Sequence, residues 1–173
     1  MRTMYRSALL IALLPLAFAC GGSSSNVSAG PMPDGGNFSG VYFSPQYGEM
    51  HLVQNGSAVH GKYKKDERSG DLQGEAEGNL LRFEWKEYKA MISNRPQLTV
   101  GHGYFHYMVD PASGDHVLKG RWGNGDDDHQ GGEWNAYKSR SRDPDLESIS
   151  TGGGDELDED DSSADEEDDD DLF

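Results

Sequence analysis

Cysteine is almost absent from this sequence, since Cys20 is the only one among 173 residues. A chain with one cysteine forms no internal disulfide, so its folded part must be stabilised by packing. Long apolar runs are scarce too. The run at residues 8–18 follows Arg2 and Arg6 and is shorter than the ~20 apolar residues that an ordinary membrane-spanning helix needs. Basic residues before a short apolar run indicate a secretory signal peptide, here over residues 1–19.

The end of that signal carries a second indication. Ala19, a small residue, stands directly before Cys20. This resembles the lipobox of bacterial lipoprotein precursors, although Ala17 stands where such boxes usually carry leucine. The resemblance implies an exported protein whose Cys20 is lipidated and attaches it to the membrane of the bacterial cell envelope, where we expect the outer membrane. The alternative is an ordinary cleaved signal peptide with an incidental cysteine.

Positive charge is missing from the C-terminal end. Residues 143–173 hold 16 acidic residues and no basic one, while residues 1–142 hold 15 of each sign, which gives the formal net charge of −16. A segment of this kind repels itself and has little to bury, so we predict a disordered acidic tail over residues 139–173. The Gly, Ser and Pro content of residues 20–37 predicts a flexible tether. Residues 38–138 remain as one domain.

The acidic tail has two interpretations. It is either a hydrated, solubilising segment or a long-range attractor for a basic envelope protein. Its charge argues against nucleic-acid binding because it would repel phosphate. The tail and the loop at residues 124–129 are also candidates for weak calcium binding, with Asp126 and Asp128 as ligands in the loop. A solvated acidic turn is the alternative for that loop, and we expect no other cofactor.

Apolar residues at the 3.6-residue spacing of a helix are lacking outside the predicted signal peptide. In residues 38–138 apolar and polar residues instead alternate with period two between frequent turns. The pattern predicts an all-β fold of eight strands in an antiparallel meander. Its clearest strand has Leu81, Phe83 and Trp85 on one face. The strand at residues 99–109 carries aromatic residues on both faces, so its inner face is not predicted.

The segment at residues 48–63 predicts a hairpin. Asn55-Gly56 is the dipeptide favoured by a two-residue type I′ turn. That turn would pair Leu52 with Val59 on a largely apolar face. The other face would be exposed to solvent.

A Gly-x-aromatic motif recurs along the chain, as in Gly40-Val41-Tyr42, Gly61-Lys62-Tyr63, Gly120-Arg121-Trp122 and Gly132-Glu133-Trp134. Glycine two residues before an aromatic lets a neighbouring side chain lie across the bare backbone and eases the coiling of a small barrel. The motif resembles the strands of avidin-like and lipocalin-like barrels. Because an open sheet would leave two unprotected edges, the motif favours an eight-stranded up-and-down barrel, with a two-sheet sandwich or half-open roll as the alternative. The biotin ligands of avidins have no position-by-position match here, so biotin binding is not implied.

An even-stranded meander places both chain ends and the short turns at one end of the barrel. The longer connections, predicted at residues 44–47, 65–69, 88–98 and 123–131, lie at the opposite mouth, where a ligand site is expected. The candidate ligand-binding residues are Tyr42, Tyr63, Trp85, Trp122 and Trp134, with Tyr47, Tyr88, Met91 and Ile92 in the loops. The alternative is that these aromatics simply fill the barrel.

The motifs of enzymes are missing as well. Once Cys20 is lipidated the chain has no thiol, no serine lies in a nucleophile-elbow sequence, and no carboxylate pair stands out. We therefore predict no enzymatic activity. The function that we expect is that of a lipid-anchored interaction or spacer module, and the alternative is a small-ligand-binding barrel with its site at the mouth.

Overall fold

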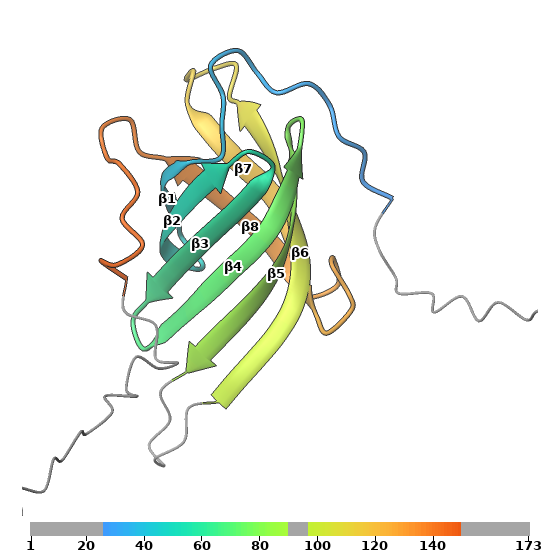
Figure 1. Cartoon of the computed structure of the whole chain (residues 1–173), viewed down its shortest axis with the longest axis vertical. Helices are drawn as coiled ribbons and strands as arrows, with labels where there is room; N and C mark the ends of the chain where they lie inside the picture. Colours follow the sequence, from blue (N-terminus) through green and yellow to red (C-terminus); the bar gives the residue numbers. More distant parts are fainter. Residues whose placement is uncertain (1–25, 90–96, 150–173) are drawn as a thin grey trace, which may run out of the picture.

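The computed structural model describes residues 26–89 and 97–149. They form a closed barrel in which each strand pairs with the next and β8 with β1 (Figure 1), so the predicted all-β meander is confirmed. The strands are β1 (Gly40–Ser44), β2 (Gly48–Asn55), β3 (Ala58–Lys65), β4 (Arg68–Glu77), β5 (Leu80–Lys89), β6 (Gln97–Val109), β7 (His116–Asn124) and β8 (Gly132–Lys138). Cys20, the predicted signal peptide at residues 1–19 and most of the predicted acidic tail lie outside the described residues. Among the described residues there is no helix with the length and apolar character to cross a membrane.

The β2–β3 hairpin has the predicted inward face but a different register, and His51, on the face predicted to be exposed to solvent, is buried. Asn55 pairs with Ala58, so the two turn residues are Gly56 and Ser57 rather than Asn55 and Gly56. Gly56 has a φ of 63°, whereas Asn55 does not have a positive φ. A glycine at the first turn position matches the twist of the two strands without requiring a left-handed asparagine. Because the pairing moves by two residues, Leu52 still faces the interior.

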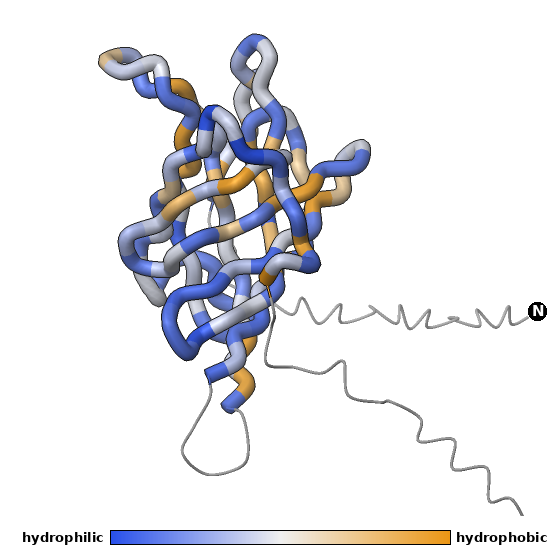
Figure 2. Tube along the Cα trace, turned by 90° about the vertical axis from the view of Figure 1, so that its left-hand side faces the viewer, coloured by the Kyte–Doolittle hydropathy of each residue, from blue (hydrophilic) through white to orange (hydrophobic). Residues whose placement is uncertain are grey.

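Inward-facing side chains fill most of the barrel, and Figure 2 shows hydrophobic and hydrophilic residues alternating along the strands. The predicted inner face of β5 is confirmed by the burial of Leu81, Phe83 and Trp85. The inner face of β6 is the one with Phe105 and Tyr107. The core consists of Phe38, Tyr42, Met50, Leu52, Val59, Tyr63, Leu72, Leu81, Phe83, Trp85, Phe105, Tyr107, Leu118, Trp134 and Ala136.

Glycines on β6 allow aromatic rings of β5 to lie across the neighbouring backbone. Trp85 is paired with Gly101 and Phe83 with Gly103. A Cβ atom at Gly101 would lie 2.7 Å from the Trp85 ring, and one at Gly103 would lie 2.6 Å from the Phe83 ring. Gly103 itself begins a Gly-x-aromatic sequence that ends at Phe105, and both glycines serve the purpose proposed for the motif. The Trp85 ring is thereby positioned inside the barrel.

Phe38 plugs the end of the barrel that holds the short turns. Its side chain is completely buried, and its ring meets that of Tyr107 edge to face at 5.7 Å between centroids. The Tyr42 hydroxyl donates a hydrogen bond of 3.0 Å to the Phe38 carbonyl oxygen. Met32 packs against the same core. This end is therefore closed by side chains, and we call it the closed end.

Residues 26–37, predicted as part of a flexible tether, lie against the barrel (Figure 1, blue). The Gly30 backbone nitrogen donates to Asn79 Oδ1 at 2.7 Å, and Asn79 donates its own backbone N–H to the Gly30 carbonyl. Arg82 donates to the Val27 carbonyl at 2.5 Å. The composition of this segment gave no sign of these contacts because its partners are distant in sequence.

Residues 139–149, predicted as the beginning of the disordered tail, form a strap along the outside of the barrel (Figure 1, orange). The Ser139 backbone nitrogen donates to the Val41 carbonyl at 2.7 Å, and Ile149 is buried. The domain therefore extends to at least residue 149 instead of ending at 138. The strap leads the chain away from the closed end, which differs from the prediction that both chain ends leave there.

The opposite end of the barrel, which we call the mouth, has tighter connections than predicted. Lys65 pairs with Arg68, so the prediction of an irregular loop at residues 65–69 is wrong. It is replaced by a two-residue turn in which Asp66 has a φ of 55°. The connection between β7 and β8 is long, as expected, at residues 125–131. Of the predicted loop at residues 88–98, residues 90–96 lie outside the described residues, including Met91 and Ile92.

Candidate functional site at the mouth of the barrel

A cavity of about 100 Å³ lies among aromatic rings at the mouth. Four of the five predicted ligand-binding residues are brought together in its wall, namely Tyr63, Trp85, Trp122 and Trp134. The fifth, Tyr42, does not line it and points back to Phe38 at the closed end. The complete lining is Tyr47, Tyr63, Arg68, Trp85, Glu87, Thr99, Trp122, Asn124 and Trp134.

Most ring pairs of the cavity wall stand nearly perpendicular to one another, while Tyr47 and Trp134 are tilted by 40°. Trp85 and Trp122 meet at 88° with centroids 5.3 Å apart, and Tyr47 meets Trp122 at 87°. Tyr63 and Trp134 meet at 78°. Edge-to-face contact is a favoured arrangement of aromatic pairs, because the positive ring edge meets the negative ring face. The wall is thus a rigid corner of ring surfaces.

Most polar atoms of these rings are held by protein partners. Trp122 Nε1 donates to the Tyr47 hydroxyl at 2.6 Å, and the Tyr63 hydroxyl donates to Glu87 at 3.1 Å. Trp85 Nε1 donates to the carbonyl oxygens of His102 and Gly123, both at 3.2 Å. Because these donors are engaged, the cavity offers ring surface more than hydrogen-bond donors to a ligand.

Trp134 is the exception. Its Nε1 is the one buried side-chain nitrogen or oxygen of the described residues that has no hydrogen-bond partner. The ring packs against Tyr47, Tyr63, Phe83 and Phe105. A buried donor without a partner costs about 1–3 kcal/mol, so packing among these rings must hold Trp134 in place.

Glu87 is the one carboxylate among the described lining residues. Its side chain is 20% exposed, and Arg68 Nη1 lies 3.9 Å from its Oε1. Burial, with the Glu87 charge as the second cause, raises the pKa of Tyr63, and burial also raises the pKa of Tyr47. Both phenols are therefore neutral at physiological pH. The charges at the site are those of Glu87 and Arg68.

Four polar lining residues were missed by the sequence reasoning: Arg68, Glu87, Thr99 and Asn124. Each continues the inward alternation of its strand toward the mouth, as Glu87 does two residues after Trp85. Extending the period-two pattern past the last apolar residue of each strand would have found them. A pattern that counts only apolar residues stops before these four positions.

The predicted calcium loop contains a small cluster of possible ligands. Asp127, Asp128 and His129 each offer a ligand atom within 4.8 Å of the others, and the predicted Asp126 is not among them. Asp128 Oδ1 lies 2.7 Å from His129 Nδ1, and Asp127 Oδ1 accepts the His129 backbone N–H at 3.1 Å. The carboxylates of Asp127 and Asp128 are therefore held by their own loop. Asp126 is exposed.

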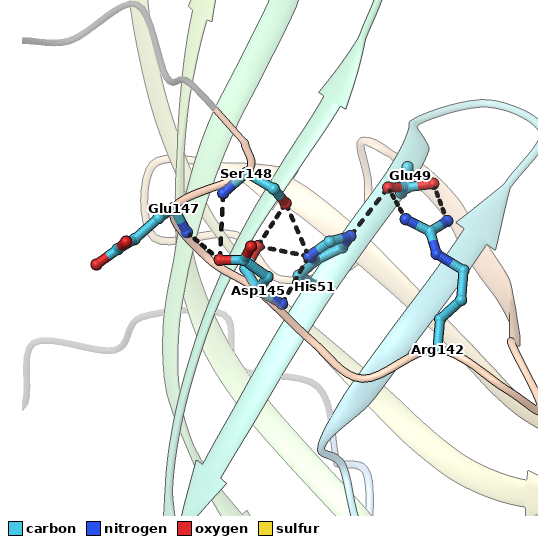
Figure 3. Close-up of polar contacts among 6 residues, drawn as sticks. All are labelled: Glu49, His51, Arg142, Asp145, Glu147 and Ser148. Carbon is cyan, nitrogen blue, oxygen red and sulfur yellow. Dashed lines mark hydrogen bonds and ion pairs between the residues drawn. The ribbon is translucent and has the colours of Figure 1, made fainter.

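Figure 3 shows a second polar cluster, where the strap meets β2. Arg142 donates to both Glu49 oxygens, and Glu49 Oε1 lies 2.9 Å from His51 Nε2. Ser148 Oγ lies 3.4 Å from His51 Nδ1, so serine, histidine and glutamate follow one another as in a nucleophile–base–acid triad. The Ser148 hydroxyl, however, donates to the Asp145 carbonyl at 2.7 Å. The cluster therefore serves as a latch for the strap.

Two larger hollows lie on the outside of the barrel. One of about 650 Å³ is lined by outward residues such as Glu75, Arg82 and Glu84. The other, of about 360 Å³, includes Tyr88 and Leu146 of the strap. Charged and polar side chains of the solvent face make up most of the lining residues, together with apolar residues such as Leu80 in the first hollow and Leu146 in the second.

Comparison of the chain with protein-family models, with curated proteins and with solved structures finds no match.

Proposed function

We propose that this protein is an exported binding module that receives a small ligand at the mouth of its barrel. The observation that carries the proposal is the aromatic cavity of about 100 Å³ among Tyr47, Tyr63, Trp85, Trp122 and Trp134. A concave, mainly apolar site with a few polar groups is the usual form of a ligand pocket. The half of the barrel near the closed end is packed with side chains, so the alternative that aromatic residues fill the interior describes that half.

The site supports binding better than catalysis. Hydrolysis by paired carboxylates needs two acidic groups on either side of the substrate bond, whereas Glu87 is the single acidic residue among the described lining residues. The ring hydroxyl of Tyr63 is engaged with Glu87. The rings instead provide a fixed surface, and a fixed surface reduces the entropy lost when a ligand binds.

Intrinsic fluorescence tests the proposal directly. All three tryptophans of the chain line the cavity, so a ligand there changes the emission without any introduced label. We expect a panel of small aromatic, aliphatic and cationic compounds to yield at least one saturable change. The change should be lost in Trp122→Leu while the melting transition remains cooperative. A panel without any saturable change would count against the binding function.

The anchor is a separate part of the proposal and rests on the sequence around Cys20. A lipidated Cys20 would hold the protein in the bacterial cell envelope, where we propose the outer membrane, with the membrane as its first partner. Replacing Cys20 by Ser should abolish fatty-acid labelling and release the protein from the membrane fraction. Continued labelling of the Cys20→Ser protein would show that the assignment is wrong.

A role as an interaction or spacer module is the second candidate, and a row of apolar side chains on the outer face favours it. Met108, Val117, Tyr137 and Phe43 are successive partners across β6, β7, β8 and β1. Phe43, Tyr137 and Met108 are 59%, 55% and 41% exposed, whereas Val117, between Met108 and Tyr137, is buried. Exposed apolar groups in one row are typical of contact surfaces. A basic envelope protein attracted by the acidic tail would be a suitable partner.

Crosslinking in intact cells distinguishes this second role. The double variant Phe43→Ser, Tyr137→Ser should lose crosslinked partners that the unchanged protein captures, while its mouth still binds small ligands. Identical crosslinks in both proteins would argue against a role for this surface.

A further inference from the structure

The composition of the mouth cavity indicates the chemical class of its ligand. Its wall combines the rings of five aromatic residues with the Glu87 carboxylate and the Arg68 guanidinium. The donors of Trp85, Trp122 and Tyr63 are turned to protein acceptors. Ring faces carry partial negative charge and attract cations. We propose that the ligand is a small organic cation of the quaternary-ammonium class, an inference that rests on the proposed function of the mouth as a binding site.

The volume of the cavity agrees with a group of this kind. A space of about 100 Å³ holds about three water molecules at ~30 Å³ each. This is far below the ~300–1,000 Å³ of pockets that enclose a drug-sized molecule. A methylated ammonium group, with about five non-hydrogen atoms, is of the right order, whereas a larger ligand would leave most of its body outside.

The two charged residues favour a cation over an anion. The Glu87 side chain is 20% exposed and that of Arg68 is 38% exposed, so the carboxylate is the more deeply buried charge. Arg68 also donates to the Gln46 carbonyl at 3.4 Å, which draws it toward the rim. An anion would be attracted by Arg68 near the rim, but deeper in the cavity it would lie beside the Glu87 carboxylate, which would repel it.

Arg68 has a specific part in this arrangement. It lies 3.9 Å from Glu87, which is a longer separation than that of a close charge-assisted hydrogen bond. A bound cation would share the carboxylate with Arg68 or displace it. Removal of the Arg68 charge should therefore strengthen cation binding, and removal of the Glu87 charge should weaken it. Two substitutions at neighbouring side chains thus have opposite expected effects.

The experiment titrates the purified full-length chain, in a non-ionic detergent and physiological salt, with tetramethylammonium and with choline. The neutral probe of the same shape as choline is 3,3-dimethylbutan-1-ol. Tryptophan emission reports on binding, and salt screens non-specific attraction to the acidic tail. We expect the cations to bind saturably and the neutral alcohol to bind at least about tenfold more weakly.

Variants provide the decisive comparison. Glu87→Gln should weaken binding of tetramethylammonium by about tenfold or more, and Arg68→Gln should strengthen it by about threefold to tenfold. The matched control is Glu84→Gln, which removes the same charge from the exposed outer face of β5 and should leave the affinity unchanged. If Glu87→Gln does not fold, the direction of the Arg68→Gln effect still tests the inference.

The outcomes separate the two proposals. Equal binding of the neutral alcohol and the cations would overturn the cationic ligand and leave the mouth as a binding site. An equal loss of affinity in Glu87→Gln and Glu84→Gln would overturn it as well, because the attraction would then come from overall charge. If neither the two cations nor the neutral alcohol changes the emission, the cation inference fails, and the wider panel of small compounds decides separately whether the mouth binds a ligand.

Discussion

His51 and Asp145 are 94 residues apart in the chain, and both backbone polar groups of Asp145 lie beside one ring nitrogen of His51. The Asp145 N–H donates to His51 Nδ1 at 3.0 Å, and the Asp145 carbonyl oxygen lies 2.6 Å from the same nitrogen. The neutral ring accepts the N–H, and the charged ring donates to the carbonyl. Nδ1 therefore has a strap partner in either protonation state.

Removal of the His51 ring should release the strap. His51 is only 1% exposed, and its loss leaves the Asp145 N–H without its acceptor and removes one of the partners of Glu49. We expect His51→Ala to lower the free energy of unfolding by about 1–3 kcal/mol. Amide exchange in residues 140–149 should accelerate more than exchange in the barrel strands. His60→Ala, at an exposed histidine of the neighbouring strand, should change neither quantity, and equal effects of both variants would contradict the latch.

The latch should also weaken at low pH. Hydrogen bonds from Arg142 are the largest cause that lowers the pKa of Glu49 from its ordinary value of 4.5 to about 2. A carboxyl group with a lowered folded-state pKa contributes its full stability above the unfolded pKa and loses it as the pH falls toward the folded pKa. Strap protection in amide exchange should therefore decrease between about pH 4.5 and pH 2.

The Glu49 side chain is 40% exposed, so solvent screening keeps the effect local and modest. Arg142→Gln should remove the pH dependence of strap protection in this range, and high salt should weaken it. An unchanged pH profile in Arg142→Gln would assign the dependence to another group.

Tryptophans at different depths should contribute differently to stability. Trp134 is 2% exposed and packs into the core, whereas Trp122 is only partly buried. In urea unfolding we expect Trp134→Leu to cost about 2–4 kcal/mol and Trp122→Leu about 1 kcal/mol. Equal costs would indicate that the mouth is packed as tightly as the interior. The missing partner of Trp134 Nε1 offsets part of the first cost, because leucine has no donor to leave unpaired.

The register of the first hairpin leads to a further prediction. Gly56 alone of the Asn55-Gly56 pair has a positive φ, so Gly56→Ala should destabilise the protein by about 1–2 kcal/mol. Asn55→Ala should cost less than about 0.5 kcal/mol, which thermal or urea unfolding can resolve from the first. Similar losses of stability at both positions would instead support the type I′ turn that the Asn55-Gly56 dipeptide predicts.

Much of the fold could be predicted because the barrel requires only alternation and short turns. Leu81, Phe83 and Trp85 alternate clearly, and the structure buries all three. The face of β6 was not predictable, since aromatic residues occupy both sides of that strand. Gly101 and Gly103 face inward there and receive the rings of Trp85 and Phe83, a relation that depends on the register between two strands.

The site was predictable in part. Tyr63, Trp85, Trp122 and Trp134 were identified from their strand positions and share one cavity. Tyr42 has the same Gly-x-aromatic pattern, but its hydroxyl is directed to Phe38 at the other end. Pattern alone does not give the height of a side chain along the barrel axis, because the height depends on the stagger between neighbouring strands.

The sequence by itself determined the strand number, the meander order and the inward faces of most strands, because these follow from local alternation and turn residues. Only the tertiary structure decided what lies at the ends of the barrel. The strap at residues 139–149 and the segment at residues 26–37 lie against the barrel through contacts with His51 and Asn79, far away in the sequence. The meeting of Glu87 and Arg68 among the rings likewise depends on the pairing of β4 with β5. Local composition does not determine which distant groups form hydrogen bonds with a segment. The latch between the strap and His51 and the cavity at the mouth therefore follow only from the tertiary structure.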